Sequence, residues 1–90
     1  MFVWLSFSDE GGFLGGALVE VQVPKNAPAK VWMGEAIGKA WRLGINPGGQ
    51  VAGAIVPRER EQAGRPYLDR LMSREEVEQM DREVAARKSS

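Results

Sequence analysis

The segment from Asn46 to Gln50 contains the residue types best suited to hold a ligand. It reads Asn-Pro-Gly-Gly-Gln. Gly48 and Gly49 can adopt positive φ, and successive backbone N–H groups in such a turn can form a concave nest for an anion. The amides of Asn46 and Gln50 could hydrogen-bond a base or a ribose. Two interpretations stay open: a binding nest, or a connection that needs glycine only for its backbone conformation.

This glycine turn does not match the known phosphate-binding motifs. It lacks the lysine and serine that end a Walker loop, and it lacks the spacing G-x-G-x-x-G. It also follows a predicted helix and leads into a predicted strand, which is the reverse of the order in dinucleotide-binding folds. The turn therefore points to no particular phosphate ligand.

Aromatic and arginine side chains elsewhere supply further candidate ligand contacts. Trp4 lies on a predicted strand and Tyr67 in a charged segment, and either could stack on a base. Arg58 and Arg65 could neutralise an anion at a subunit junction. A solvated, salt-bridged linker is the alternative interpretation of the arginine–tyrosine segment.

The chain contains no histidine and no cysteine. Zinc sites built on these residues and histidine-based triads are therefore excluded. The acidic residues have structural interpretations, since Asp9 and Glu10 are adjacent in a predicted turn, and Glu75 and Glu76 begin a predicted helix, where they favour the dipole. We predict no catalytic residue, no metal site and no cofactor, and we expect a protein that is not an enzyme.

The charges of the chain also limit its partners. Twelve basic and twelve acidic residues cancel, with four of each up to Pro57 and eight of each beyond it. Without a positive stripe, duplex nucleic acid is not an expected partner, and without an apolar run of about 18 residues a membrane is not expected either. The absence of cysteine and of a signal-peptide pattern predicts a cytoplasmic location, the host cytoplasm if the chain is phage-encoded.

The first part of the chain predicts a β-hairpin. Aromatic and β-branched residues fill 2–7, turn residues follow, and a second apolar run extends over 13–23. Gly15 and Gly16 interrupt this second run and predict a bulge, or a place where another backbone or a ligand approaches closely. The first strand is apolar on both faces, so one face needs a cover besides a helix, and a second subunit is the simplest candidate.

A helix and a third strand are predicted next. The helix extends from about Ala27 to Leu43 with Asn26 as its N-cap. Trp32 and Trp41 flank its apolar arc and are expected at the edge of the core, with a role as ligand platforms as the alternative. Gln50 to Val56 forms a strand of small residues. If this strand pairs with the first one, the sheet order is 2-1-3 and every neighbouring pair is antiparallel.

The predicted fold is a single α+β domain with three parts. A β-β-α-β core over 1–57 is covered by one helix, a charged linker with a short helical turn spans 58–72, and a C-terminal helix spans 73–88. Ser73 and Glu76 form a capping box at the start of that helix, whose narrow apolar stripe favours a sheet edge or a subunit partner over a core. Because ninety residues without disulfides bury only a marginal core, we expect a homo-oligomer.

Several segments resemble small proteins from phage and bacterial genomes to which no active site is assigned. The likeness rests on Phe13 to Ala17, on Ala40 to Val51 with the pattern A-W-x-L-G-I-N-P-G-G-x-V, and on Leu71 to Glu76. In size and α/β build the chain also looks like phage anti-defence proteins that sequester the nucleotide signals of bacterial immune systems. That second likeness is one of type, with no shared motif.

Two functional predictions follow from these features. The first is a non-enzymatic protein that sequesters a small anionic ligand, in particular a nucleotide-derived immune signal, at subunit interfaces. The residues expected to contact this ligand are Trp4, Asn46, Gly48, Gly49, Gln50, Arg58, Arg65 and Tyr67. The second is a protein-interaction module that blocks a host enzyme through its exposed sheet face and its C-terminal helix.

Overall fold

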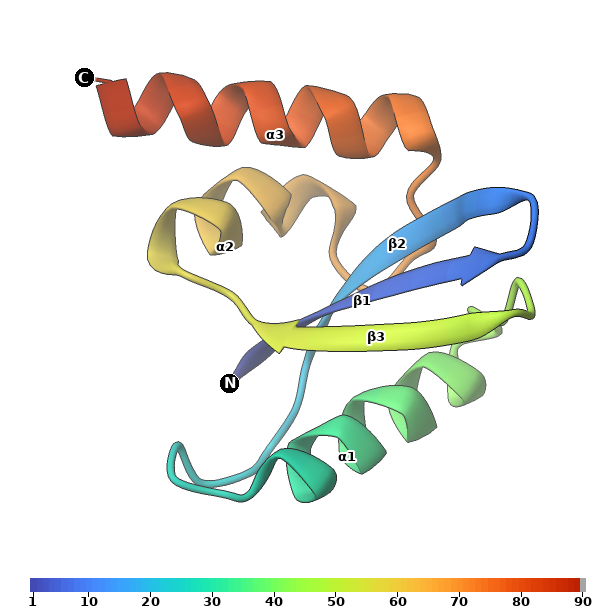
Figure 1. Ribbon diagram of the computed structural model, residues 1–90. Coiled ribbons are helices and arrows are strands. Elements are labelled where there is room, and N and C mark those ends of the chain that lie inside the picture. Colours follow the sequence, from blue (N-terminus) through green and yellow to red (C-terminus); the bar gives the residue numbers. More distant parts are fainter. Residues whose placement is uncertain (90) are drawn as a thin grey trace.

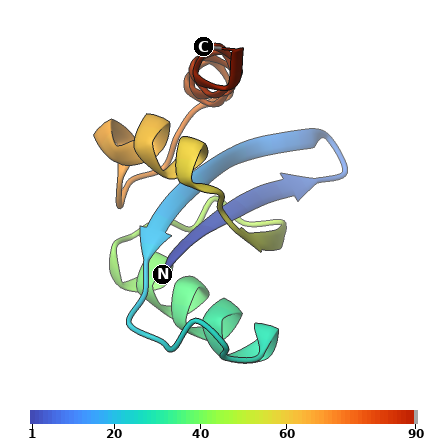
Figure 2. The same cartoon turned by 90° about the vertical axis from the view of Figure 1, so that its left-hand side faces the viewer.

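A three-stranded antiparallel sheet lies between one helix on one face and two helices on the other (Figures 1 and 2). The computed structural model describes residues 1–89. The elements in chain order are β1 (Phe2–Asp9), β2 (Gly12–Glu20), α1 (Ala29–Arg42), β3 (Gln50–Ile55), α2 (Arg58–Gly64), the 3-10 turn η1 (Arg65–Tyr67) and α3 (Arg74–Ser89). The strand order is β2-β1-β3, so the predicted order 2-1-3 and the α+β class are confirmed.

The β1–β2 hairpin contains both features that its glycines predict. The pairing register shifts between Phe7 and Ser8, where β2 carries an extra residue. Gly16 also meets a second backbone, because it donates to the Met72 carbonyl at 3.1 Å and accepts from the Met72 N–H at 2.7 Å. A Cβ at Gly15 would lie 2.8 Å from that carbonyl oxygen. The two glycines therefore allow the segment before α3 to lie along β2.

The start of α1 differs from the prediction. The helix begins at Ala29 with Pro28 at the N-cap position, and no side-chain hydrogen bond caps it in the described chain. Asn26 lies instead in a turn that is closed by the Ala27 N–H, which donates to the Pro24 carbonyl at 3.0 Å. The chain turns before Pro28, and Pro28 itself is extended, with a φ that proline's ring favours. The helix therefore begins only at the next residue.

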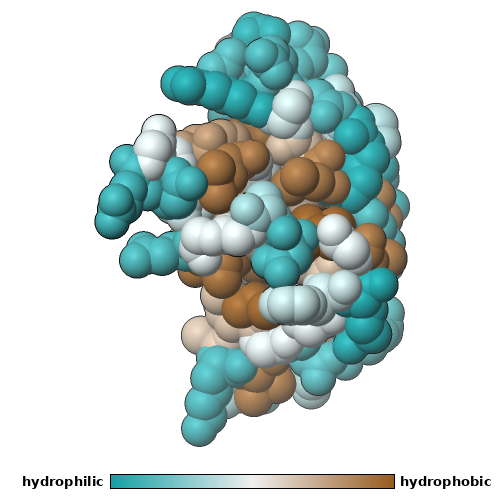
Figure 3. Space-filling view, turned by 90° about the vertical axis from the view of Figure 1, so that its right-hand side faces the viewer, coloured by the Kyte–Doolittle hydropathy of each residue, from teal (hydrophilic) through white to brown (hydrophobic). Residues whose placement is uncertain are grey.

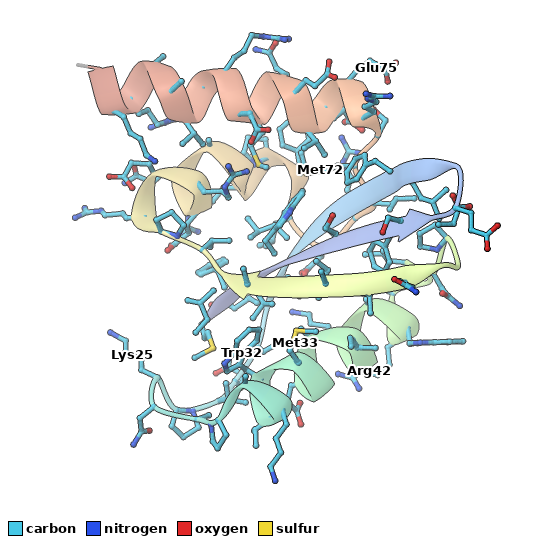
Figure 4. All side chains as sticks on the ribbon, in the orientation of Figure 1. Lys25, Trp32, Met33, Arg42, Met72 and Glu75 are labelled. Carbon is cyan, nitrogen blue, oxygen red and sulfur yellow. The ribbon has the colours of Figure 1, made fainter. Side chains whose placement is uncertain are left out.

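Helix α1 covers one face of the sheet, as predicted. Its Ala36 and Ala40 are buried against side chains that alternate along β1 and β2. Met33 lies between α1 and the sheet (Figure 4), close enough that a Cβ at Gly53 of β3 would meet its sulfur. The sheet residues in this first core are Val3, Leu5, Phe7, Ala17 and Val19. Small helix residues here let α1 lie close to the sheet.

The other face of the sheet is covered by the chain itself, which corrects the expectation that a second subunit covers it. Residues 58–64, predicted as loop, form α2, and β2 ends at Glu20 rather than at residue 23. A Cβ at Gly64 would lie 2.6 Å from Leu18, so glycine lets α2 pack onto β2. Trp4 also packs here. The second buried cluster consists of Ala63, Met72, Met80 and Val84.

Helix α3 packs through the narrow stripe that its sequence predicts. Met80 and Val84 are buried against α2 and over the edge strand β2, so the stripe does cover a sheet edge. The cover over this edge is shared, because α2 packs against α3 and contributes Ala63 to the same buried cluster. Met72 lies on the same side of the sheet as α3 (Figure 4).

The first turn of α3 carries the predicted capping box. Glu76 N–H donates to Ser73 Oγ at 3.3 Å, and Ser73 N–H donates to Glu76 Oε1 at 3.1 Å. Arg70 also binds the Glu76 carboxylate. The hydrogen bond from Arg70 and those from Ser73 hold the pKa of Glu76 below its usual value of 4.5. The ionised form of Glu76 therefore makes the stronger cap.

We expect Arg70→Gln to raise the pKa of Glu76 towards its usual value, because the guanidinium that favours the carboxylate is removed. An NMR titration of the Glu76 carboxyl carbon measures this. Since the pKa is lower in the folded chain than in the unfolded one, the interaction stabilises the fold above pH 4.5, and this contribution is lost as pH falls through the folded-state pKa. Arg74→Gln is the control, because Arg74 pairs with Glu78. Equal Glu76 pKa values in both variants would contradict the pairing.

Candidate functional site

Within one chain, the structure does not bring the eight predicted ligand residues together. The four from the glycine turn lie at the end of the sheet that carries the β1–β2 turn. Trp4, Arg65 and Tyr67 lie on the face covered by α2 and α3. Arg58 begins α2, at the opposite end of β3 from the glycine turn. In a single chain the predicted residues therefore lie in three separate places.

The glycine turn has the conformation that its sequence predicts. Gly48 has a φ of 89° and Gly49 a φ of 74°. A Cβ at Gly49 would lie 2.3 Å from the Ser8 carbonyl oxygen, so this glycine is needed for the turn to pass β1. At Gly48 a Cβ would have no described atom within 4 Å. Gly49 thus has a structural role, while Gly48 faces open space.

An acidic pocket of about 430 Å³ lies on one side of this turn. It is lined by Ser8, Asp9, Glu10, Gly49 and Gln50. Asp9 Oδ1 accepts a hydrogen bond from the Gly11 N–H at 2.8 Å, and Glu10 is exposed. Two carboxylates repel a phosphate but accept hydrogen bonds from hydroxyl groups. This pocket suits a sugar better than an anion.

An apolar pocket of about 190 Å³ lies on the other side of the turn. Its lining residues are Leu5, Phe7, Ile37, Ala40, Trp41, Ile45, Asn46, Gly48, Gly49 and Val51. Trp41 is 63% exposed, so its ring is free to contact a ligand. Figure 3 views this end of the molecule, where brown apolar atoms are exposed between teal polar ones. The two pockets share Gly49.

The sequence predicted Trp41 at the edge of the core, with a role as a ligand platform only as the alternative, and Trp41 was not among the eight predicted ligand residues. The C-terminus of α1 explains its exposure. Gly44 has a φ of 79°, and Ile45 N–H donates to the Ala40 carbonyl at 2.8 Å, so the chain turns back on the helix. Ile45 then fills the core position beside Ala40. The Leu-Gly-Ile sequence after the helix was the available signal, because it is typical of such a helix end.

Trp4 and Tyr67 take part in packing. A Cβ at Gly16 would lie 2.3 Å from the Trp4 ring, so the indole already lies against β2. Tyr67 packs against the second buried cluster, and the Arg70 guanidinium lies 5.2 Å from the centre of its ring. Both rings are only partly exposed. In the single chain both rings pack against the buried cluster that joins α3 to the rest of the fold.

The two predicted arginines differ in their surroundings. Arg65 pairs with Glu61 at 2.8 Å, and its guanidinium lies 5.2 Å from the centre of the Phe2 ring. Arg58 is exposed and forms no ion pair within residues 1–89. Of the two, Arg58 is therefore the one available to a ligand or to another chain.

Metal ligands and membrane spans were also sought in the described part of the chain. Residues 1–89 contain no cluster of three or more Asp or Glu side chains that could hold a metal ion. None of the helices in this range is long and apolar enough to cross a membrane. Compared with protein-family models, curated proteins and solved structures, the chain matches none. The resemblance to phage and bacterial proteins thus stays a prediction.

Proposed function

We propose that this protein is a non-enzymatic binding protein for a small ligand that combines a flat ring with a hydroxyl-bearing sugar, as nucleosides and nucleotide-derived signals do. One observation carries this proposal: an apolar pocket with an exposed tryptophan adjoins a pocket with two carboxylates, and both share Gly49. The immune-signal class follows from the likeness to phage sequestering proteins. Sequestration would need binding alone, without turnover.

Each part of the ligand has a matching group. The ring would stack on Trp41 and enter the apolar pocket, with the Asn46 amide at its polar edge. Sugar hydroxyls would donate to Asp9 and Glu10, as acidic side chains do in dinucleotide-binding folds. A phosphate at the Gly48 N–H would need a positive charge from another chain, because the nearby side chains are acidic or neutral. Nucleosides and singly charged derivatives therefore fit one chain best.

Replacement of Trp41 tests the proposal most directly. We expect Trp41→Ala to weaken binding about 5- to 150-fold, since stacking a base on an aromatic ring contributes about 1–3 kcal/mol. Isothermal titration calorimetry with adenosine, ADP-ribose and a cyclic dinucleotide gives the dissociation constants. Leu43→Ala is the matched control, because Leu43 is exposed near the same helix end and lines neither pocket. No heat from any of these compounds at millimolar concentration would remove the proposal.

A second measurement separates sequestration from catalysis. Native mass spectrometry of protein purified from its host would show a bound small molecule, and heating would release it. A sequestering protein returns the ligand unchanged. Recovery of an altered nucleotide after incubation would instead favour an enzyme.

One observation favours a second candidate function, the blocking of a host protein. Strand β3 is an edge strand with a free side, and such an edge can accept a strand from another protein. A blocking module would co-purify with a host protein and would give no response to nucleotides. The same calorimetric experiment therefore distinguishes the two candidate functions, because only a ligand-binding protein should give a heat of binding with nucleotides.

A further inference from the structure

The outward edge of β3 has no partner within residues 1–89. Val56 N–H donates to the Phe2 carbonyl at 3.3 Å. Since hydrogen-bonded residues alternate along an antiparallel strand, the even-numbered residues of β3 face β1 and the odd-numbered ones face away. Val51, Gly53 and Ile55 therefore direct their backbone N–H and C=O groups outward. No hydrogen bond from another described segment reaches them.

The opposite edge of the sheet, on β2, is bonded over much of its length by other parts of the chain. The same alternation makes the even-numbered residues of β2 face outward. Four of their groups are bonded: Gly16 N–H and C=O to Met72, the Leu18 carbonyl to the Asp69 N–H at 3.0 Å, and the Glu20 carbonyl to Lys39 Nζ at 2.7 Å. The β2 edge is therefore covered over much of its length, whereas no outward group of β3 has a partner in the described chain.

Strand β3 also lacks the devices that protect a free edge. Proteins commonly blunt such edges with lysine, proline or a bulge. From Gln50 to Val56 the chain has no charged residue and no proline, and its pairing with β1 is regular. Ala52 and Ala54 are exposed on the face away from α1, and Ile55 is 50% exposed. The strand thus combines small side chains, regular pairing with β1 and an unprotected outer edge.

We propose that β3 pairs antiparallel with β3 of a second copy of this chain, across a two-fold axis at Gly53. This register joins Gly53 to Gly53, and Val51 to Ile55, as hydrogen-bonded pairs, with about six N–H···O=C bonds in total. It uses every outward group of β3 and places Ala52 opposite Ala54. The pairing does not depend on the ligand proposed above.

The charges at the two ends of β3 are complementary under this pairing. Asp9 and Glu10 lie beside the start of β3, while Lys25 and Arg58 lie at its end (Figure 4 labels Lys25). Glu59 also lies at the end of β3, so that end carries two cations and one anion. None of these five charged residues forms an ion pair in the described chain. Antiparallel pairing brings the basic end of each copy beside the acidic end of the other.

The helices leave room for the second copy. α1 packs mainly under β1 and β2, and α3 packs over β2, so neither extends across the free side of β3 (Figure 1). Ile55 of the second copy would cover Val51, which lines the apolar pocket. Arg58 of the second copy would lie near Gly48. The junction would thus supply the positive charge that the glycine turn lacks in one chain.

Two double substitutions on the exposed face test the pairing and its register. In Ala52→Lys/Ala54→Lys, the introduced lysines face each other across the axis, so association should weaken by about tenfold or more. In Ala52→Lys/Ala54→Glu, each introduced lysine faces a glutamate, so the dimer should persist. Sedimentation equilibrium gives the mass of both variants and of the wild type, for which we expect two chains.

Amide hydrogen exchange in the wild type keeps the proposal testable even if the lysine variant fails to fold. The amides of Val51, Gly53 and Ile55 should become protected as concentration rises, whereas those of Ala52 and Ala54, bonded to β1, should be protected throughout. A wild-type monomer at hundreds of micromolar, unprotected outward amides, or equal dissociation of the two variants would overturn the pairing. Calorimetry measures ligand binding independently of β3 pairing. Failure of the ligand proposal can therefore be distinguished from failure of the pairing proposal.

Discussion

Met80→Ala is expected to lower the free energy of unfolding by about 2–5 kcal/mol, a large share of the stability of so small a protein. Met80 is fully buried and packs against Ala63, Met72 and Val84. The cluster has few members, so a cavity there removes much of the contact between α3 and α2. Denaturant titration followed by circular dichroism gives the change. We also expect α3 amides to exchange faster.

Gln79→Ala is the matched control for Met80→Ala. Gln79 is the preceding residue on α3 and is exposed, with only side-chain hydrogen bonds to Glu83 and Arg82. Its replacement should change stability by less than about 0.5 kcal/mol. Similar unfolding free energies for the two variants would mean that α3 does not pack on the sheet as described.

Gly49→Ala is expected to destabilise the protein by about 2–5 kcal/mol. The left-handed conformation costs a residue with a Cβ about 1–2 kcal/mol, and crowding adds a further penalty of about 1–3 kcal/mol. Here the Cβ would lie 2.3 Å from the Ser8 carbonyl oxygen, which belongs to the backbone and moves only with β1. Thermal and denaturant unfolding measure the loss.

The neighbouring glycine provides the comparison for Gly49→Ala. Gly48 has a similar positive φ, but a Cβ there would meet no described atom within 4 Å. Gly48→Ala should therefore lower the free energy of unfolding only by the cost of the left-handed backbone conformation, about 1 kcal/mol. It should also test ligand binding on a folded chain, because Gly48 lines the apolar pocket. Equal destabilisation by the two variants would contradict the close approach of the turn to β1.

Local sequence signals predicted the elements that depend on neighbouring residues. The β1–β2 hairpin follows from β-branched and aromatic runs around a turn, and the start of α3 follows from the Ser73–Glu76 capping box. Helix α2 was missed because it has only seven residues and a charged composition. Its signal was Pro57 followed by Glu59 and Glu61 in the first turn.

The candidate site was predicted only in part, because a site depends on what lies beside it. The glycine turn is local, so its two positive φ values could be predicted. The neighbours of that turn, Asp9 and Glu10, are about forty positions away along the chain and meet it only through the pairing of β1 with β3. The exposure of Trp41 likewise depends on Ile45 filling the core position.

The sequence by itself determined the α+β class, the bulge beside Gly15 and the cap of α3, because each rests on residue preferences within a short stretch. The strand order followed from the sequence only on the condition that the third strand pairs with the first. Only the tertiary structure decided that α2 and α3 pack on the second face of the sheet, and that other segments bond to the β2 edge and none to the outward edge of β3 in the described chain. These outcomes depend on which distant segments bury each other's apolar surface and pair their backbone N–H and C=O groups. No single stretch of the chain determines that pairing.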